Sequence, residues 1–117
     1  MSKLTLYSNR SGFDVVVDAG SLRVIEPVYV VNEFDGYDGY SATWELDPSE
    51  MYIFIRIFEM KGGDYDVWAC LGKVPEDNAV ACERRYHFWA RSVSTGVGKA
   101  LRAMRLLRDD EVWLPLI

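Results

Sequence analysis

The chain has 117 residues, of which 50% are hydrophobic and 14% aromatic, and its net charge is −5. This composition excludes a disordered chain, and the length predicts a single domain over residues 1–117 with one hydrophobic core. No apolar run reaches the roughly 18 residues of a membrane span, and residues 1–10 contain no apolar signal segment. We therefore expect a cytoplasmic protein that does not enter a membrane.

The first half of the chain is expected to form strands. Residues 3–7 and 13–18 alternate or are β-branched, and the polar segment between them predicts a hairpin turn. Residues 22–31 form another extended run, in which Pro27 cannot donate a ladder hydrogen bond, so this strand is expected at a sheet edge or bulge. Residues 52–59 are apolar on both faces and predict a central strand covered on each side.

The second half predicts two more strands and one helix. A glycine pair leads into a strand at residues 65–71, and residues 72–83 contain the turn formers of a loop. Residues 85–93 predict a further strand, although strand or helix stays open for the stretch 80–93. A helix is expected from Ser94 or Thr95 to about Arg108. The predicted fold is α+β, an antiparallel sheet of about five to six strands backed by one C-terminal helix in two layers.

The two cysteines indicate neither a disulfide framework nor a metal site. Reduced thiols are the favoured interpretation of Cys70 and Cys82, and a bridge between them is the alternative. Together with His87, the only histidine, they match no zinc-binding spacing. We therefore expect no metal and no cofactor.

Charge is distributed unevenly along the chain. Residues 1–83 hold 15 acids and 6 bases, a net charge of −9, whereas residues 84–117 hold 3 acids and 7 bases, a net charge of +4. The most concentrated acidic stretch is 33–50, with six carboxylates, four aromatic rings and no Lys or Arg. Acids mixed with large rings can both attract a basic partner and contribute contact area.

We interpret segment 33–50 as a recognition surface of a non-catalytic protein-interaction domain. Carboxylates along an extended chain imitate a row of phosphates, so the segment would occlude a basic site on a nucleic-acid-handling protein. Viruses and mobile elements use small acidic proteins in this way against host nucleases and CRISPR complexes. A solvated loop, or pairing with the basic helix, are the structural alternatives. The predicted partner-binding residues are Glu33, Asp35, Tyr37, Asp38, Tyr40, Trp44, Glu45 and Asp47.

Two other function classes stay open. The first is a Mg²⁺-dependent nuclease-like enzyme, because an Asp followed by Glu-x-Lys at a strand end is a phosphodiester-cleaving constellation, here Asp47, Glu59 and Lys61. The second is a nucleic-acid or anion binder through the basic face of the helix, Lys99, Arg102 and Arg105, with Arg85 and Arg91 on the neighbouring strand. The apolar tail 112–117 and any exposed rings would suit a homodimer.

Overall fold

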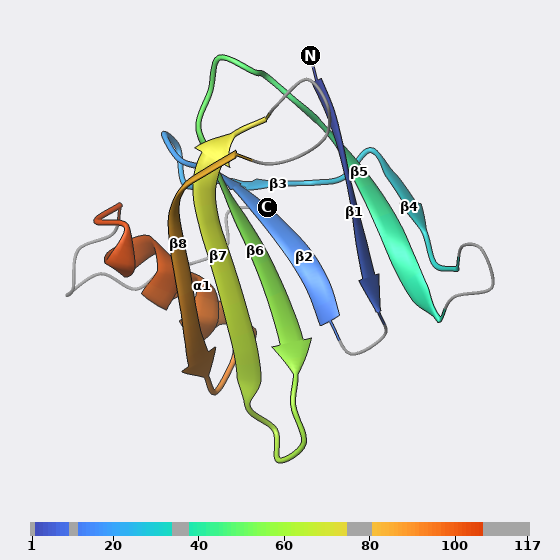
Figure 1. Cartoon of the computed structure of the whole chain (residues 1–117), viewed down its shortest axis with the longest axis vertical. Helices are drawn as coiled ribbons and strands as arrows, with labels where there is room; N and C mark the ends of the chain where they lie inside the picture. Colours follow the sequence, from blue (N-terminus) through green and yellow to red (C-terminus); the bar gives the residue numbers. More distant parts are fainter. Residues whose placement is uncertain (1, 10–11, 34–37, 75–80, 107–117) are drawn as a thin grey trace.

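The computed structural model describes residues 2–9, 12–33, 38–74 and 81–106. Within these ranges the chain forms eight strands followed by one helix (Figure 1). The elements are β1 (Ser2–Asn9), β2 (Gly12–Asp18), β3 (Val24–Ile25), β4 (Tyr29–Val31), β5 (Gly39–Leu46), β6 (Tyr52–Glu59), β7 (Tyr65–Lys73), β8 (Ala81–Ala90) and α1 (Val93–Ala103).

The strands form two antiparallel sheets of unequal width. The large sheet has five strands in the order β3-β2-β6-β7-β8, and the small sheet has three in the order β1-β5-β4. β6 lies at the centre of the large sheet, as its two apolar faces predict. The predicted α+β class, with an antiparallel sheet backed by a C-terminal helix, is confirmed. The small sheet is an additional layer that the sequence pattern does not reveal.

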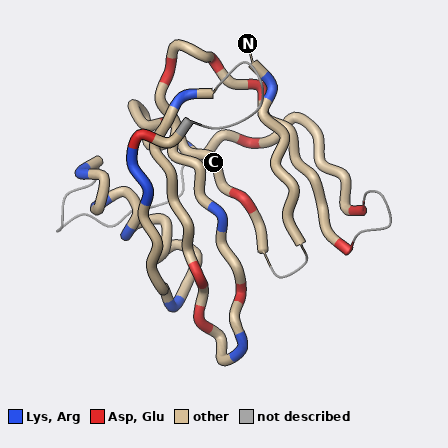
Figure 2. Tube along the Cα trace, viewed as in Figure 1, with Lys and Arg blue, Asp and Glu red and all other residues tan. Residues whose placement is uncertain are grey.

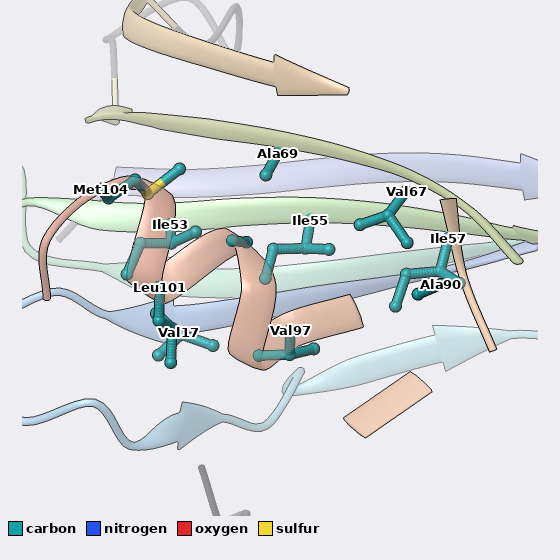
Figure 3. Packing of buried hydrophobic residues seen from close by; sticks show 11 residues of the cluster. Val17, Ile53, Ile55, Ile57, Val67, Ala69, Ala90, Val97, Leu101 and Met104 are labelled. Atoms are coloured by element: carbon teal, nitrogen blue, oxygen red, sulfur yellow. The ribbon is translucent and has the colours of Figure 1, made fainter. Parts of the chain in front are cut away.

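The helix covers one face of the large sheet. Alternate residues of β6, Ile53, Ile55 and Ile57, point toward α1 together with Val67, and all four are at most 1% exposed (Figure 3). Leu101 of α1 enters the same cluster. These strand positions are buried because the period of two places every second side chain on the same face.

The limits of the helix and of the preceding strand differ from those expected. Residues 81–90 form strand β8, so the stretch 80–93, for which the sequence leaves strand or helix open, is mainly a strand. The helix begins two residues after β8 because Ser92, in an extended conformation, accepts a hydrogen bond from the Thr95 amide on its Oγ at 3.1 Å. It ends at Ala103 rather than near Arg108. Arg105 takes a left-handed φ of 60°, and the Leu106 amide then bonds back to the Leu101 carbonyl at 2.8 Å.

The small sheet packs on the opposite face of the large one, where it encloses a second core. Trp44 of β5 and Leu4 of β1 meet Tyr52 and Phe54 of β6 in this cluster. Trp44 is only 2% exposed, and its Nε1 donates to the Ile25 carbonyl at 2.8 Å. Both inner faces contribute alternate residues, so this half of the molecule resembles a β-sandwich.

One predicted strand pairing and the predicted extent of one strand are wrong. Segments 3–7 and 13–18 do not form a hairpin, because β1 pairs with β5 in the small sheet while β2 pairs with β3 and β6 in the large one. The run 22–31 does not form one strand either. It divides into β3 and β4, which belong to different sheets on either side of Pro27. Local patterning predicts that a segment is extended, but the choice of partner depends on which faces can be buried together.

A candidate ligand cleft between the two sheets

The difference in width between the sheets leaves an open cleft. The small sheet packs against β2 and β6, while β7 and β8 lie at the far flank of the large sheet (Figure 1). A cavity of about 500 Å³ lies along this boundary, within the range of small-ligand sites. Its walls include Leu6 from the small sheet and Phe54, Trp68, Cys70, Arg85 and His87 from the large sheet.

Four of the lining residues form a single row across the large sheet. Asp14 is the register partner of Arg56, Arg56 of Trp68, and Trp68 of His87. Directly opposed residues on one face have Cβ atoms about 5 Å apart. The row therefore places a carboxylate, a guanidinium, an indole and an imidazole side by side across four neighbouring strands, although their positions in the sequence are far apart.

Asp14 is the buried end of this row and holds Arg56 in place. Its Oδ1 accepts a hydrogen bond from Arg56 Nε at 2.8 Å, and its side chain is 1% exposed against 38% for Arg56. Burial raises the pKa of the Asp14 carboxyl above its usual 3.8, and the hydrogen bond and charge of Arg56 counteract this rise. Because the contact uses Nε, the outer nitrogens of the guanidinium remain available toward the cleft.

Two hydroxyl groups from the small sheet complete the buried end of the row. The Tyr40 hydroxyl accepts a hydrogen bond from the Asp14 amide at 2.6 Å, which joins β5 to β2. Burial, and secondly the charge of Asp14, raise the pKa of Tyr40 above 10.0. Ser8 lies close enough to lower the pKa of Asp14. Even so, Ser8 Oγ and Asp14 Oδ2 make no well-formed hydrogen bond within the described part of the chain.

At the exposed end of the row, one carboxylate orients two rings. Asp66 Oδ2 accepts a hydrogen bond from Trp68 Nε1 at 3.0 Å, and Asp66 Oδ1 is in close contact with His87 Nε2. The indole and imidazole stack with centroids 3.8 Å apart and planes 13° apart. Trp68 is nevertheless 49% exposed. The result is a flat platform that is fixed in orientation and accessible to solvent.

Beside this platform, a disulfide and an arginine line the cleft. Cys70 of β7 is bonded to Cys82 of β8, so the predicted reduced thiols are wrong in this structure. The two positions lie on neighbouring antiparallel strands, which brings their Cα atoms to 5.4 Å. Arg85 is the register partner of Cys70 and is exposed.

The chemistry of the cleft is suited to an anion attached to a flat or apolar group. Asp14 is already paired with Arg56, and Asp66 with His87. The described lining contains no carboxylate besides Asp14, so it offers no acidic side chain to Arg85. The Asp66–His87 pair has the geometry of a proton-transfer dyad, but the described lining offers it no serine, threonine or free thiol as a nucleophile.

Two rings of the predicted acidic–aromatic surface, Tyr40 and Trp44, point inward. Trp44 is in the core between the sheets, and Tyr40 is bonded to the Asp14 amide. Alternation along β5 places both rings on the face that meets the large sheet. Asp35 and Tyr37 lie outside the described residues. The rings of Tyr40 and Trp44 are thus part of the fold and not of an exposed recognition surface.

The described acids of that surface are exposed but do not form one patch. Glu33 and Asp38 lie before β5, whereas Glu45 and Asp47 lie at its other end, roughly 20 Å away along the strand. Figure 2 shows acidic residues at separate ends of the small sheet. Hydrogen bonds from the Ser49 amide and hydroxyl, at 2.9 and 2.7 Å, lower the pKa of Asp47.

The proposed magnesium ligands are separated by the length of a strand. Asp47 is held near the first residue of β6, where its amide donates to the Tyr52 hydroxyl at 3.0 Å. Glu59 is the last residue of β6, and Lys61 follows in the next turn. Eight residues of strand span more than 20 Å. The three side chains do not form one site, and no cluster of metal-binding groups occurs elsewhere among the described residues.

The basic residues of the C-terminal part fall on two surfaces. Lys99 and Arg105 are exposed on or just after α1, Arg102 is half-buried, and Lys99 Nζ donates to the Trp89 carbonyl at 3.1 Å. Arg85, in contrast, lies on the other side of the large sheet, in the cleft. Arg91 is exposed between β8 and α1. The structure therefore separates the predicted basic face of the helix from Arg85.

Sequence reasoning missed Asp14, Arg56, Asp66 and Trp68. One feature of the sequence could have pointed to them: a charged residue on an otherwise apolar strand face, as Arg56 is in β6. Only the register between strands places these residues in neighbouring rows.

No family model, curated protein or solved structure matches this chain. None of the helices in the described part is long and apolar enough to cross a membrane.

Proposed function

We propose that this chain is a non-catalytic binding domain that recognises an anionic group, a carboxylate or phosphate attached to a flat or apolar body, in the cleft between the two sheets. The observation that carries the proposal is the row Asp14–Arg56–Trp68–His87 along the cleft floor, with Arg85 in the next row. This proposal keeps the function class expected from the sequence, a non-catalytic binding module, but places the binding surface in the cleft and not in segment 33–50.

Each part of the row has a role in this proposal. Arg56 is pre-oriented by Asp14, so little side-chain freedom is lost when its outer nitrogens bind an anion. Arg85 supplies a second guanidinium from the neighbouring strand. The exposed indole of Trp68 offers a surface for a planar ligand. Leu6 and Phe54 provide apolar walls for the uncharged part.

The test is calorimetric titration with indole-3-acetate and phenyl phosphate, using uncharged indole-3-ethanol as the reference. We expect both anions to bind more tightly than the reference, and their affinity to fall as salt is added. Arg85→Gln should weaken anion binding by about tenfold to a hundredfold, because a hydrogen bond to a charged group contributes about 1.5–3 kcal/mol.

Arg84→Gln is the matched control. Arg84 is the neighbour of Arg85 and is also exposed, but it pairs with Leu71, whose side chain packs on the helix side of the sheet. Alternation therefore directs Arg84 away from the cleft. This variant should bind the anions as the wild type does. Equal losses in the two variants, or no preference of the wild type for the anions, would contradict the proposal.

A second candidate is the inhibitor suggested by the acidic segment, acting by occlusion of a nucleic-acid-handling protein. It is favoured by one observation, that Glu33, Asp38, Glu45, Asp47 and Glu50 are all exposed. Pulldown of basic partners should then be lost when Glu45 and Asp47 are both changed to Lys. An unchanged set of captured proteins would remove this candidate.

A further inference from the structure

Strand β8 is a long edge strand bordering the proposed cleft. It is last in the order of the large sheet and has ten residues, and no described strand pairs with its outer side. The opposite edge of this sheet is β3, with two residues, and the edges of the small sheet are β4, with three, and β1, with eight, so β8 is the longest of the described edge strands. Natural edge strands are usually short or covered, because a long edge can pair with another chain.

The end of this edge is partly covered from the helix side. Lys99 of α1 donates to the Trp89 carbonyl near the end of β8. The stretch of β8 from Arg84 to Phe88 lies before this contact. The side chains of Arg84, Arg85 and His87 in this stretch are all exposed.

The charge of the edge selects the kind of partner. Between Ala81 and Arg91 the chain carries three arginines and one glutamate, besides His87. Figure 2 shows this basic run along β8, where an acidic residue occurs only near its beginning. Arg85 and His87 project on the cleft side, and Arg84 on the other. An added strand would therefore meet cations on both of its faces.

We propose that the partner of the cleft is an extended acidic peptide segment, which adds to the outer edge of β8 as a further antiparallel or parallel strand. Backbone hydrogen bonds to β8 would provide affinity, and alternate side chains would provide specificity. Carboxylates on one face of the peptide would reach Arg85 and His87. This inference rests on the proposed function, since it names the class of ligand for the same cleft.

The edge pairing is tested with a short capped peptide in which Glu and Val alternate. Four peptides are compared by calorimetry: the parent, one with Gln in place of Glu, and two with N-methyl groups on alternate backbone amides, one in each register. N-methylation removes the ladder donors but keeps the charges. We expect at least tenfold weaker binding for the Gln peptide and for one of the two N-methylated registers, with slowed amide hydrogen exchange in β8 on binding of the parent.

The protein variants are Arg85→Glu and, as the control, Lys61→Glu. Both make the same change in net charge, but Lys61 is exposed in the turn between β6 and β7. Arg85→Glu should weaken binding of the parent peptide at least tenfold, and Lys61→Glu by less than threefold. Equal effects of the two variants would reduce the interaction to non-specific charge attraction and overturn the inference.

The outcomes separate this inference from the proposed function. If indole-3-acetate binds but N-methylation in neither register weakens the peptide, strand addition is wrong while the anion cleft stands. If neither indole-3-acetate nor the peptide binds, both proposals fail. Tighter binding of oligothymidylate than of the peptide would assign the basic edge to single-stranded nucleic acid and overturn the peptide proposal.

Discussion

The covered and open halves of the inner face belong to one large sheet but differ in what lies above them. Toward β2, the side chains of Val16 and Phe54 are buried beneath the small sheet. Toward β8, this row continues through Cys70 to the exposed Arg85, and the neighbouring row that begins at Asp14 and Arg56 ends in the exposed Trp68 and His87. Burial along a row is therefore decided by the width of the covering sheet. One sheet face supplies both a core and a candidate site.

The largest effect expected from this comparison concerns two tryptophans. Trp44→Ala removes a 2% exposed ring from the covered half and should lower the free energy of unfolding by about 3–5 kcal/mol. Trp68→Ala in the open half, where the ring is 49% exposed, should change it by less than about 1 kcal/mol. Urea denaturation of both variants measures the difference. Similar losses would mean that the two halves are not energetically distinct.

The disulfide tests how the open half is held together. Replacing Cys70 and Cys82 by Ser removes the bridge between β7 and β8, and should lower the free energy of unfolding by about 3 kcal/mol. The wild type treated with a reducing agent is the control and should match the double variant in denaturation. Unchanged stability in both would show that strand pairing alone holds β8 in place.

Asp14 lies where the two halves meet, and the direction of its pKa shift predicts how its contribution to stability changes with pH. Burial raises its pKa in the folded state, so ionised Asp14 is less favourable in the folded than in the unfolded chain. Its contribution to stability is fully present below the unfolded pKa, near 3.8, and is lost as pH rises through the folded pKa.

Asp14→Asn keeps an acceptor for Arg56 Nε but cannot ionise. Its free energy of unfolding relative to wild type should therefore rise as pH increases from about 3 to 7. Urea denaturation across this range measures the difference. A relative stability that falls with pH would mean that attraction to Arg56 outweighs desolvation.

The smallest stability effect is expected from His87→Gln. The imidazole is exposed at the end of the row, so the free energy of unfolding should change by less than about 0.5 kcal/mol. Binding of indole-3-acetate should still weaken, because the stack that supports Trp68 is lost. The weaker binding is measured from the emission of Trp68, which is the difference between the fluorescence of the protein with Trp68 and that of the Trp68→Phe variant. A stability loss above 1 kcal/mol would place His87 among the structural residues.

Prediction from sequence identified most of the local elements but not which strands pair with one another. The strand at β6 and the helix near residue 100 follow from periodicity, because burial on one face repeats every two or every 3.6 residues. The hairpin proposed between the first two strands failed, since a turn-like segment also permits a crossing between sheets. Strand β5 was missed, because the acidic segment was expected to be a loop or an exposed recognition surface, whereas the rings of Tyr40 and Trp44 lie on its side that meets the large sheet.

The sequence by itself determined the α+β class, the central position of β6 and the basic character of the C-terminal part. These depend on composition and on short-range alternation, which each segment carries with it. Only the tertiary structure decided that Cys70 meets Cys82, that Asp14 holds Arg56, and that β7 and β8 extend beyond their cover. Register and sheet width arise from contacts between segments distant in the chain, and no local pattern encodes them.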